Sequence, residues 1–477
     1  MDIPGETPPD LAERYRQLRP FDNAEVALVR ALVGHPSRLS RPYELVLRRA
    51  LNLARLWVIH TRSGECVVGP QLSLFRDQVR KLADRIIQSD TVEPDALGLD
   101  AAELEPRLQT ARESILSQNL GRISPGELDE EINEKALVLA VGGGGGCGYV
   151  HLGAFATLEG LGLRPRFIAG SSIGSILGLF RARWEGFRTT TIRAVTHGLS
   201  FRKMFRILDS ETRYAMPGAL RLYLRTSLSR FFMNTAGQTL RLEELDLPLV
   251  VVVTGIRREA ARRVRHYEQL VERELRRGAI GRLLHLRDLV TNVVSFLSEL
   301  IQTPGAMRPI VLGADSHTKA FDVLDAVGFS SALPAVIQYD ITRDDPRMHA
   351  LMQKTLQDND VDYFADGGIA SNVPARAAWE AVQRGQIGTR NAFILGLDCF
   401  APQMRRNVMY LPLMRLAAEN VAIDRHFAHS MFTYRRTLPP TALVPGPRAL
   451  QTALDDGRRE FAQEGPFLRK MLEPLKL

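Results

Sequence analysis

Short, continuous apolar runs in the middle of the chain have the length of buried strands. Residues 136–141 (ALVLAV), 249–253 (LVVVV) and 393–398 (FILGLD) are mostly aliphatic, as is typical of strands covered on both faces. Five glycines, residues 142–146, follow the first run. Behind them, apolar residues recur at helical spacing: Val150, Ala154, Leu158 and Leu161. The pattern predicts that the glycines form a turn between a strand and a helix.

Helical patterns dominate both ends of the chain. Leucines among arginines at residues 45–56, and the segment 74–87, predict amphipathic helices. Residues 124–127 (SPGE) are a capping-box start with proline in the first turn. We therefore expect a helical N-terminal region at residues 1–130, a central domain at 131–400 and a helical C-terminal region at 401–477.

Composition adds few constraints. The 477 residues suffice for two or three domains, and the formal net charge is +8. Only seven of the 62 basic residues are lysines, a bias that genome composition can produce, so we expect no nucleic-acid partner. The three cysteines are widely spaced and offer no metal-ligand pattern, which suits a reducing compartment.

The ends and apolar runs also bear on localisation. The N-terminus lacks a basic segment followed by an apolar one, so no secretory signal peptide is predicted. No apolar run approaches the roughly 18 residues of a transmembrane helix. We expect a cytoplasmic or peripheral membrane protein.

The glycine run and the next turn have features suited to acyl transfer. A second apolar segment, residues 167–169, leads into Gly170-Ser171-Ser172-Ile173-Gly174, a G-x-S-x-G sequence before an apolar helix. A serine on a sharp strand-to-helix turn needs small neighbours, which Gly170 and Gly174 supply. The positive end of the helix favours a developing alkoxide on Ser172. A glycine loop upstream can direct several N–H groups to one point, as an oxyanion hole requires.

Other interpretations of the glycines are less well supported. Gly143, Gly145 and Gly148 also match the dinucleotide-binding pattern, but that site wants an acidic residue about 20 positions on, at the end of the next strand. Here the only acid in between, Glu159, falls on the helix. A phosphate-binding P-loop would need Gly-Lys-Ser/Thr, which is absent. A loop that only packs a helix on a strand is the remaining alternative.

A third motif completes a family pattern. With Asp366-Gly367-Gly368 far downstream, the sequence resembles the patatin-like phospholipases, in which a glycine-rich oxyanion loop, G-x-S-x-G and a distant D-G-G/A occur in this order. Residues 148–155, 247–254, 330–334 and 372–374 extend the resemblance over roughly residues 136–398. One position departs from it, because Cys147 stands where the family usually has Arg or Lys.

The resemblance implies a three-layer α/β fold with a mostly parallel central sheet, and a serine lipid acyl hydrolase of the phospholipase A type. Ser172 is then the nucleophile and Asp366 its base, a dyad rather than a triad, with N–H groups of Gly144, Gly145 and Gly146 as the oxyanion hole. Gly143, Gly148, Gly170, Gly174, Gly367 and Gly368 support these motifs. The substrate is a phospholipid or another lipid ester, and neither a cofactor nor a metal is expected.

Alternatives remain for the function and for the base. The same fold suits a transacylase, an esterase of other lipids or a non-catalytic lipid-binding scaffold, although the intact Ser172 and Asp366 argue against the last. His426 and His429 follow Asp366, so the order Ser…Asp…His of other hydrolases is formally present. His151 is interpreted as a packing residue. Asp366-Gly367 taken alone is also a common turn dipeptide.

A basic helical insertion is expected at about residues 255–310. Between Arg257 and Arg287 there are ten arginines against four glutamates, and residues 293–301 then become apolar. Near an anionic membrane each basic residue contributes about 1 kcal/mol, so the insertion is a candidate for peripheral membrane contact. A solvated basic helix packed on the core fits the pattern equally well.

Overall fold

The computed structural model describes residues 9–88, 94–190, 192, 199–207, 212–260, 303, 305–401 and 411–476. Most of the basic insertion expected at about 255–310 therefore lies outside the described residues. Within the described part, no helix has both the length and the apolar character needed to cross a bilayer.

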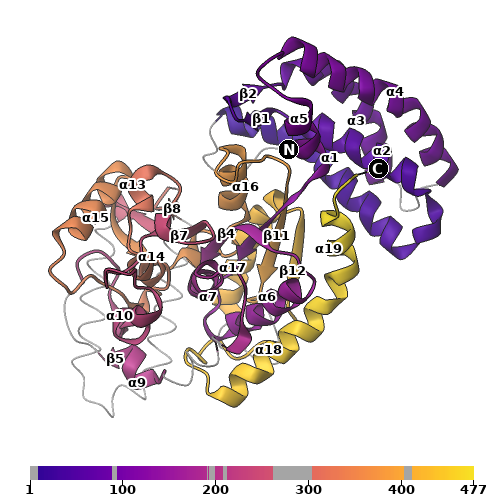
Figure 1. Ribbon diagram of the computed structural model, residues 1–477. Helices are drawn as coiled ribbons and strands as arrows, with labels where there is room; N and C mark the ends of the chain where they lie inside the picture. Colours follow the sequence, from indigo (N-terminus) through magenta and orange to yellow (C-terminus); the bar gives the residue numbers. More distant parts are fainter. Residues whose placement is uncertain are drawn as a thin grey trace.

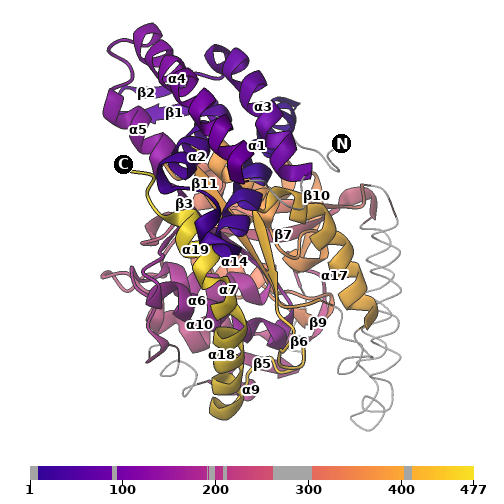
Figure 2. The same ribbon diagram turned by 90° about the vertical axis from the view of Figure 1, so that its right-hand side faces the viewer.

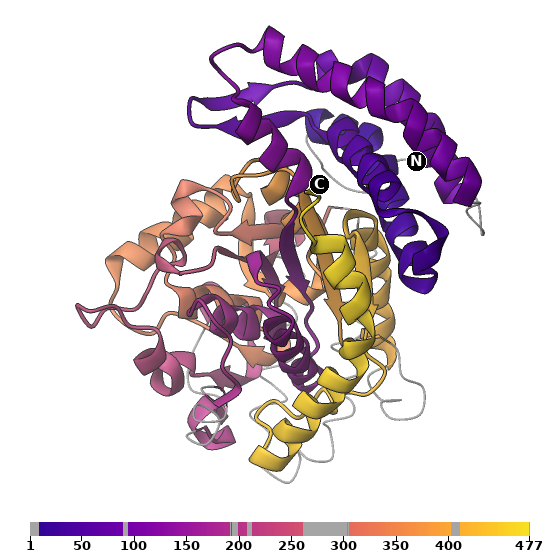
Figure 3. The same ribbon diagram turned by 45° about the vertical axis from the view of Figure 1, so that its right-hand side comes forward.

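The N-terminal region is a layer of helices with a small hairpin. Ser124 caps the last helix, since its side chain accepts from the Glu127 N–H while the Glu127 carboxylate accepts from the Ser124 N–H. The hairpin was not expected, because its two strands are too short to show an apolar period. The elements are α1 (Pro9–Gly34), α2 (Arg41–Arg55), β1 (Val58–Thr61), β2 (Gly64–Val67), α3 (Ser73–Gln88), α4 (Pro94–Gln118) and α5 (Pro125–Asn133). Figure 3 shows this layer above the central sheet.

The central sheet is mixed, with mostly parallel strands. In the described residues its order is β10-β7-β4-β3-β11-β12, with β8 paired to β7. The pairs β7–β4, β4–β3, β3–β11 and β11–β12 are parallel, whereas β10 and β8 run antiparallel to β7. The strands are β3 (Ala136–Val141), β4 (Pro165–Ser171), β7 (Leu249–Arg257), β8 (Met307–Leu312), β10 (Val361–Ala365), β11 (Ala392–Asp398) and β12 (Ser430–Thr433).

Strand β3 shows why both faces of the sheet are covered. Its alternate residues Leu137, Leu139 and Val141 belong to one buried cluster, and Ala136, Val138 and Ala140 belong to another. Side chains alternate across a strand, so an all-apolar strand needs helices on both sides. One face is covered by α6 (His151–Gly160), α7 (Ile173–Ala182) and α14 (Val323–Ser330), and the other by α16 (Ala375–Gln383) and the start of α1. The expected three-layer α/β fold is confirmed.

A second, smaller sheet has its strands labelled in Figure 2. It consists of β5 (Phe205–Ile207), β6 (Gly218–Leu222) and β9 (Ala335–Gln338), in that order. The Ala215–Phe364 bridge ties it to β10 of the main sheet. Around it are α9 (Phe201–Met204), α10 (Leu224–Leu228), α13 (Ser316–Lys319) and α15 (Pro346–Asp358), all labelled in Figure 1.

The C-terminal region returns to the main sheet. After α17 (Leu411–Asp424), visible in Figure 2, strand β12 pairs with β11. The region was expected to be helical, and this short strand is an addition that only the tertiary pairing reveals. Two helices follow: α18 (Pro447–Phe461) packs on α6, and α19 (Gly465–Leu472) packs on α1.

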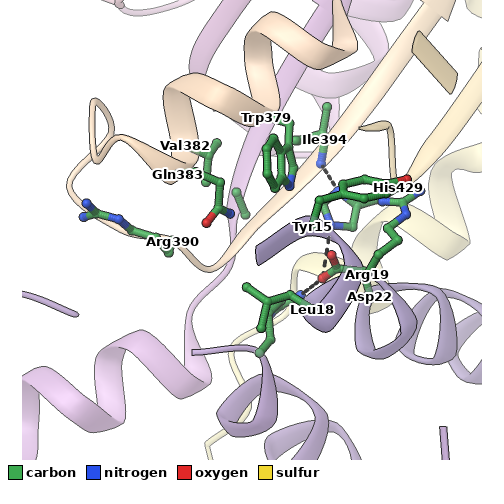
Figure 4. A pocket seen from close by; sticks show the side chains of 12 residues that line it. Tyr15, Leu18, Arg19, Asp22, Trp379, Val382, Gln383, Arg390, Ile394 and His429 are labelled. Carbon is green, nitrogen blue, oxygen red and sulfur yellow. Dashed lines mark hydrogen bonds and ion pairs between the residues drawn. The ribbon is translucent and has the colours of Figure 1, made fainter. Parts of the chain in front are cut away.

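Buried polar contacts join the N-terminal helices to the sheet. Arg55 donates to Asp22 Oδ1 at 2.7 Å and also to Asn391, which precedes β11. Lys135 Nζ lies 2.9 Å from Glu25 Oε2. Buried charges are tolerated only when they are paired, so these contacts fix one docking geometry. Figure 4 shows the pocket at this junction, with Asp22 and Tyr15 of α1 opposite Trp379 of α16.

Candidate active site

Ser172 occupies a strained turn between β4 and α7. Its φ is +51° and its ψ is −130°, a conformation that side chains rarely adopt and that marks functional sites. A Cβ atom at Gly170 would lie 2.6 Å from Ser175 Cα, and one at Gly174 would lie 2.3 Å from Val141 O. Both flanking positions therefore require glycine, for the reason that the G-x-S-x-G pattern suggested.

Two other serines hold this turn in place. The Ser172 N–H donates to Ser330 Oγ at 2.9 Å, and Ser330 Oγ donates to Val252 O at 2.6 Å. Ser175 Oγ donates to Ser172 O at 2.6 Å. Hydrogen bonds at both backbone groups offset the cost of the unfavourable φ. The signal for Ser330 in the sequence was only the small-residue segment 330–334, and no role was assigned to it.

Asp366 meets Ser172 from the opposite direction. Ser172 Oγ donates to Asp366 Oδ2 at 2.6 Å, and the Gly368 N–H donates to Asp366 Oδ1 at 2.8 Å. Parallel β4 ends with Ser171 beside Val252 of β7, whereas antiparallel β10 ends with Ala365 beside Thr254. The two strands thus converge on the same stretch of β7, which brings the two motifs together.

The backbone around Asp366 is also fixed. Its N–H donates to Ala332 O at 2.8 Å, and its carbonyl accepts from Thr254 Oγ1 at 2.7 Å. Gly367 and Gly368 form a short 3-10 turn directly after it. Thr254 ends the segment 247–254 that resembles the family's middle strand, but no role was assigned to it from the sequence.

Burial raises the pKa of Asp366 to about 6, although the hydrogen bonds from Ser172 and Gly368 oppose that shift. The side chain is 7% exposed and Ser172 is 8% exposed. Removing a carboxylate from water disfavours its charged form. A carboxylate with a pKa near neutrality is a stronger base than an exposed one, and it is still mostly ionised at pH 7.

The glycine loop lies directly beside the serine. A Cβ atom on Gly143 would be 2.8 Å from Ser172 Cβ, and one on Gly148 would be 2.4 Å from Ile173 Cγ2. The loop carbonyls face protein groups, because His151 Nε2 lies 3.1 Å from Gly142 O and Cys399 Sγ donates to Gly143 O at 3.1 Å. These contacts fix the orientation of the loop.

The loop N–H groups divide into two sets. Those of Gly142, Gly143 and Gly146 donate to Leu397 O, Asn372 O and Pro440 O. Those of Gly144 and Gly145 have no acceptor among the described residues. Of the three donors expected for an oxyanion hole, the Gly146 N–H is engaged by Pro440 O in this conformation.

The histidines considered from the sequence are occupied elsewhere. Burial lowers the pKa of His151 to about 4, so its ring is neutral. His429 Nδ1 accepts from the Ile394 N–H at 2.8 Å, and its Nε2 lies 3.3 Å from Asp22 Oδ1, in the pocket of Figure 4. The His426 side chain is exposed. Among the described residues, no histidine hydrogen-bonds to Asp366, so the geometry offers a serine–aspartate pair.

Within the described part of the chain, no group of three or more His, Cys, Asp or Glu side chains is arranged to hold a metal ion.

Comparison with known proteins finds a matching family. The family model described as patatin-like phospholipase matches residues 139–379. The matched segment begins in β3, ends in α16 and contains both Ser172 and Asp366. Among curated proteins, none matches the chain significantly.

Proposed function

The chain belongs to the patatin-like phospholipase family and is a lipid acyl hydrolase, and from this premise we propose that it cleaves fatty-acyl esters of membrane lipids through a Ser172–Asp366 dyad. The observation that carries the proposal is the 2.6 Å hydrogen bond from Ser172 Oγ to Asp366 Oδ2. This hydrogen bond joins the G-x-S-x-G and D-G-G motifs, which occur together in the family pattern. No described histidine hydrogen-bonds to the Asp366 carboxylate.

The reaction has two half-reactions. Ser172 Oγ attacks the ester carbonyl while Asp366 takes its proton, and the tetrahedral intermediate collapses as the C–O bond to the alcohol breaks. Asp366 returns the proton to the leaving alcohol. Water then attacks the acyl-serine, again with Asp366 as base, and the fatty acid leaves as Ser172 regains its proton.

The oxyanion is stabilised by backbone groups. The N–H groups of Gly144 and Gly145 have no acceptor among the described residues, and the residue before them, Gly143, lies against Ser172; we therefore assign these two groups as the donors. Such a donor contributes about 3 kcal/mol to the transition state. Ser172 also precedes α7, whose positive end favours negative charge on the serine oxygen.

The substrate is a lipid presented at a surface, which we propose the basic segment at about 255–310 helps the enzyme to reach. Three arginines of this segment are described, namely Arg257, Arg258 and Arg308. Arg258 Nε lies 3.2 Å from Asp362 Oδ1 in β10. Arg258, near the start of the segment, therefore lies beside the strand that leads to Asp366. Ten arginines against four glutamates give it the charge that an anionic bilayer attracts.

A fluorophosphonate probe and a lipid panel test the proposal. Wild type should be labelled and should release fatty acid from phospholipid vesicles, and Ser172→Ala should do neither. Ser171→Ala is the matched control, because Ser171 is adjacent and buried and its Oγ has no hydrogen-bond partner among the described residues. Labelling that survives in Ser172→Ala, or that is lost in Ser171→Ala, would overturn the choice of nucleophile.

A transacylase of the same fold is the second candidate, since an alcohol can replace water in the second half-reaction. Supplying an acceptor lipid and analysing products separates the two: hydrolysis yields free fatty acid, whereas transfer yields a new ester.

A further inference from the structure

Residues 437–443, here called the C-terminal strap, lie across the glycine loop. The strap connects β12 to α18 and falls outside the segment that matches the family. Three hydrogen bonds join it to the loop and the turn that follows: the Gly146 N–H donates to Pro440 O at 2.9 Å, Cys147 Sγ to Leu438 O at 3.1 Å and the Tyr149 hydroxyl to Leu443 O at 2.8 Å.

The strap also packs tightly on the loop. A Cβ atom at Gly146 would lie 2.2 Å from Pro439 O and 2.8 Å from Ala442 Cβ. No residue larger than glycine fits there unless the strap moves away. The two segments therefore share one packed arrangement.

Both ends of the strap are anchored on elements beside the site. Upstream, β12 pairs with β11, and the Tyr434 N–H donates to Asp398 O at 2.9 Å. Downstream, α18 crosses α6 so closely that a Cβ atom at Gly153 would lie 2.2 Å from Arg458 N. Because both of its ends are anchored, the strap itself has little freedom to move. Its contacts therefore restrain the glycine loop.

The loop is therefore held from two sides. His151 and Cys399 contact the carbonyls of Gly142 and Gly143, and the strap holds residues 146–149. Gly144 and Gly145 lie between the two sets of contacts. We propose that the strap is a positioning device for the oxyanion hole, which keeps the Gly144 and Gly145 N–H groups directed to the oxygen that develops charge.

The strap accounts for the departure from the family pattern at Cys147. The side chain is fully buried, and the strap covers the position where the family usually carries a basic residue. Burial raises the pKa of the Cys147 thiol to about 11, so it stays protonated and can donate to Leu438 O at neutral pH. A short donor at this position fits beneath the strap, whereas a long cationic side chain does not.

The inference rests on the proposed function, and its test separates the two. The variants are Tyr149→Phe and Cys147→Ala, each of which removes one strap contact, with Cys147→Ser as the conservative variant that keeps a donor. Tyr43→Phe is the control, because Tyr43 is exposed on α2 in the N-terminal region. The readouts are kcat and KM on a soluble short-chain ester, the rate of fluorophosphonate labelling, and the melting temperature.

Tyr149→Phe and Cys147→Ala should each lower kcat and the labelling rate about tenfold with KM within twofold, because the oxyanion contact is made in the transition state. Cys147→Ser should recover most of the loss and Tyr43→Phe should show none. Unchanged kcat in both variants would reduce the strap to a structural element, and increased kcat would make it an inhibitory cover; either result overturns the proposal. A wild-type protein that neither turns over nor labels would instead refute the proposed function.

Discussion

Ser172 and Asp366 form a 2.6 Å hydrogen bond although they lie 194 positions apart in the chain. Strand β7 makes this possible, because it pairs with Ser171 through Val252 and with Ala365 through Thr254. Strand β4 runs parallel to β7 and β10 runs antiparallel to it, so the residues that follow these two strands, Ser172 and Asp366, meet beside the same part of β7. The separation of the pair is set by the register of a third strand.

Asp366→Asn should lower kcat at least a thousandfold, because the amide cannot accept the serine proton. At neutral pH the same substitution should stabilise the fold, although it lowers activity. The folded-state pKa of Asp366 is raised from 3.8 to about 6 by burial, so the native state holds its proton more tightly than the unfolded state does. The contribution of this group to stability is therefore full below pH 4 and is lost as the pH rises through about 6.

The melting temperature of Asp366→Asn relative to wild type should accordingly increase between pH 4 and pH 7. The shift corresponds to about 3 kcal/mol as an upper bound. A variant that is less stable than wild type at pH 7 would show that the Ser172 and Gly368 hydrogen bonds outweigh the burial of the charge.

The pH dependence of kcat/KM should show one ascending limb with a midpoint near pH 6, since the base must be ionised and the pKa of Asp366 is raised to about 6. Asp424 is the control, because burial raises its pKa to about 7 while its partner is Ser371 rather than Ser172. Asp424→Asn should leave the midpoint in place. Loss of the ascending limb in Asp424→Asn would show that the titrating group is Asp424 and not Asp366.

Ser330→Ala should lower kcat about tenfold and destabilise the fold by about 1–3 kcal/mol, because the Ser172 N–H and Val252 O both lose a buried partner. Steady-state kinetics and chemical denaturation measure the two effects. Ser331→Ala is the matched control, since the Ser331 hydroxyl donates only to Val327 O within its own helix turn. Equal kinetic losses in the two variants would remove the special role of Ser330.

Cys147→Arg should lower both the melting temperature and the activity, because the side chain at this position is fully buried beneath Leu438. Thermal melting and ester hydrolysis provide the measurements. A stable variant with a large gain specific to phospholipids would mean instead that the missing basic charge limits the enzyme.

Replacing Arg262, Arg263, Arg265, Arg276 and Arg277 by Gln should weaken cosedimentation with anionic vesicles and hydrolysis of vesicle lipids, because each basic charge near such a surface contributes about 1 kcal/mol. Hydrolysis of a soluble short-chain ester should persist. Neutral vesicles are the control, and added salt should reproduce the loss in wild type. Binding that does not change on substitution would leave the segment without a role at the membrane.

The sequence by itself determined the elements whose chemistry is local. The apolar run 136–141 predicts a strand with both faces covered, and G-x-S-x-G predicts a serine on a tight turn, since side-chain pattern and glycine spacing carry that information. Asp366 was selected as the base by its place in a family pattern, because Asp-Gly alone is a common turn.

Only the tertiary structure decided which groups complete the site. Ser330 and Thr254 act through single hydroxyls, and the strap residues Leu438, Pro440 and Leu443 make their hydrogen bonds to the loop and the turn after it through carbonyl oxygens. Every residue has a carbonyl, so no residue type marks such an acceptor in a sequence. The hydrogen bond from the Gly146 N–H to Pro440 O joins residues that are nearly three hundred positions apart in the sequence. It forms because β12 pairs with the sheet and α18 packs on α6, which places the strap over the loop. Local patterns specify elements, whereas the register and packing between them specify the geometry of the oxyanion loop.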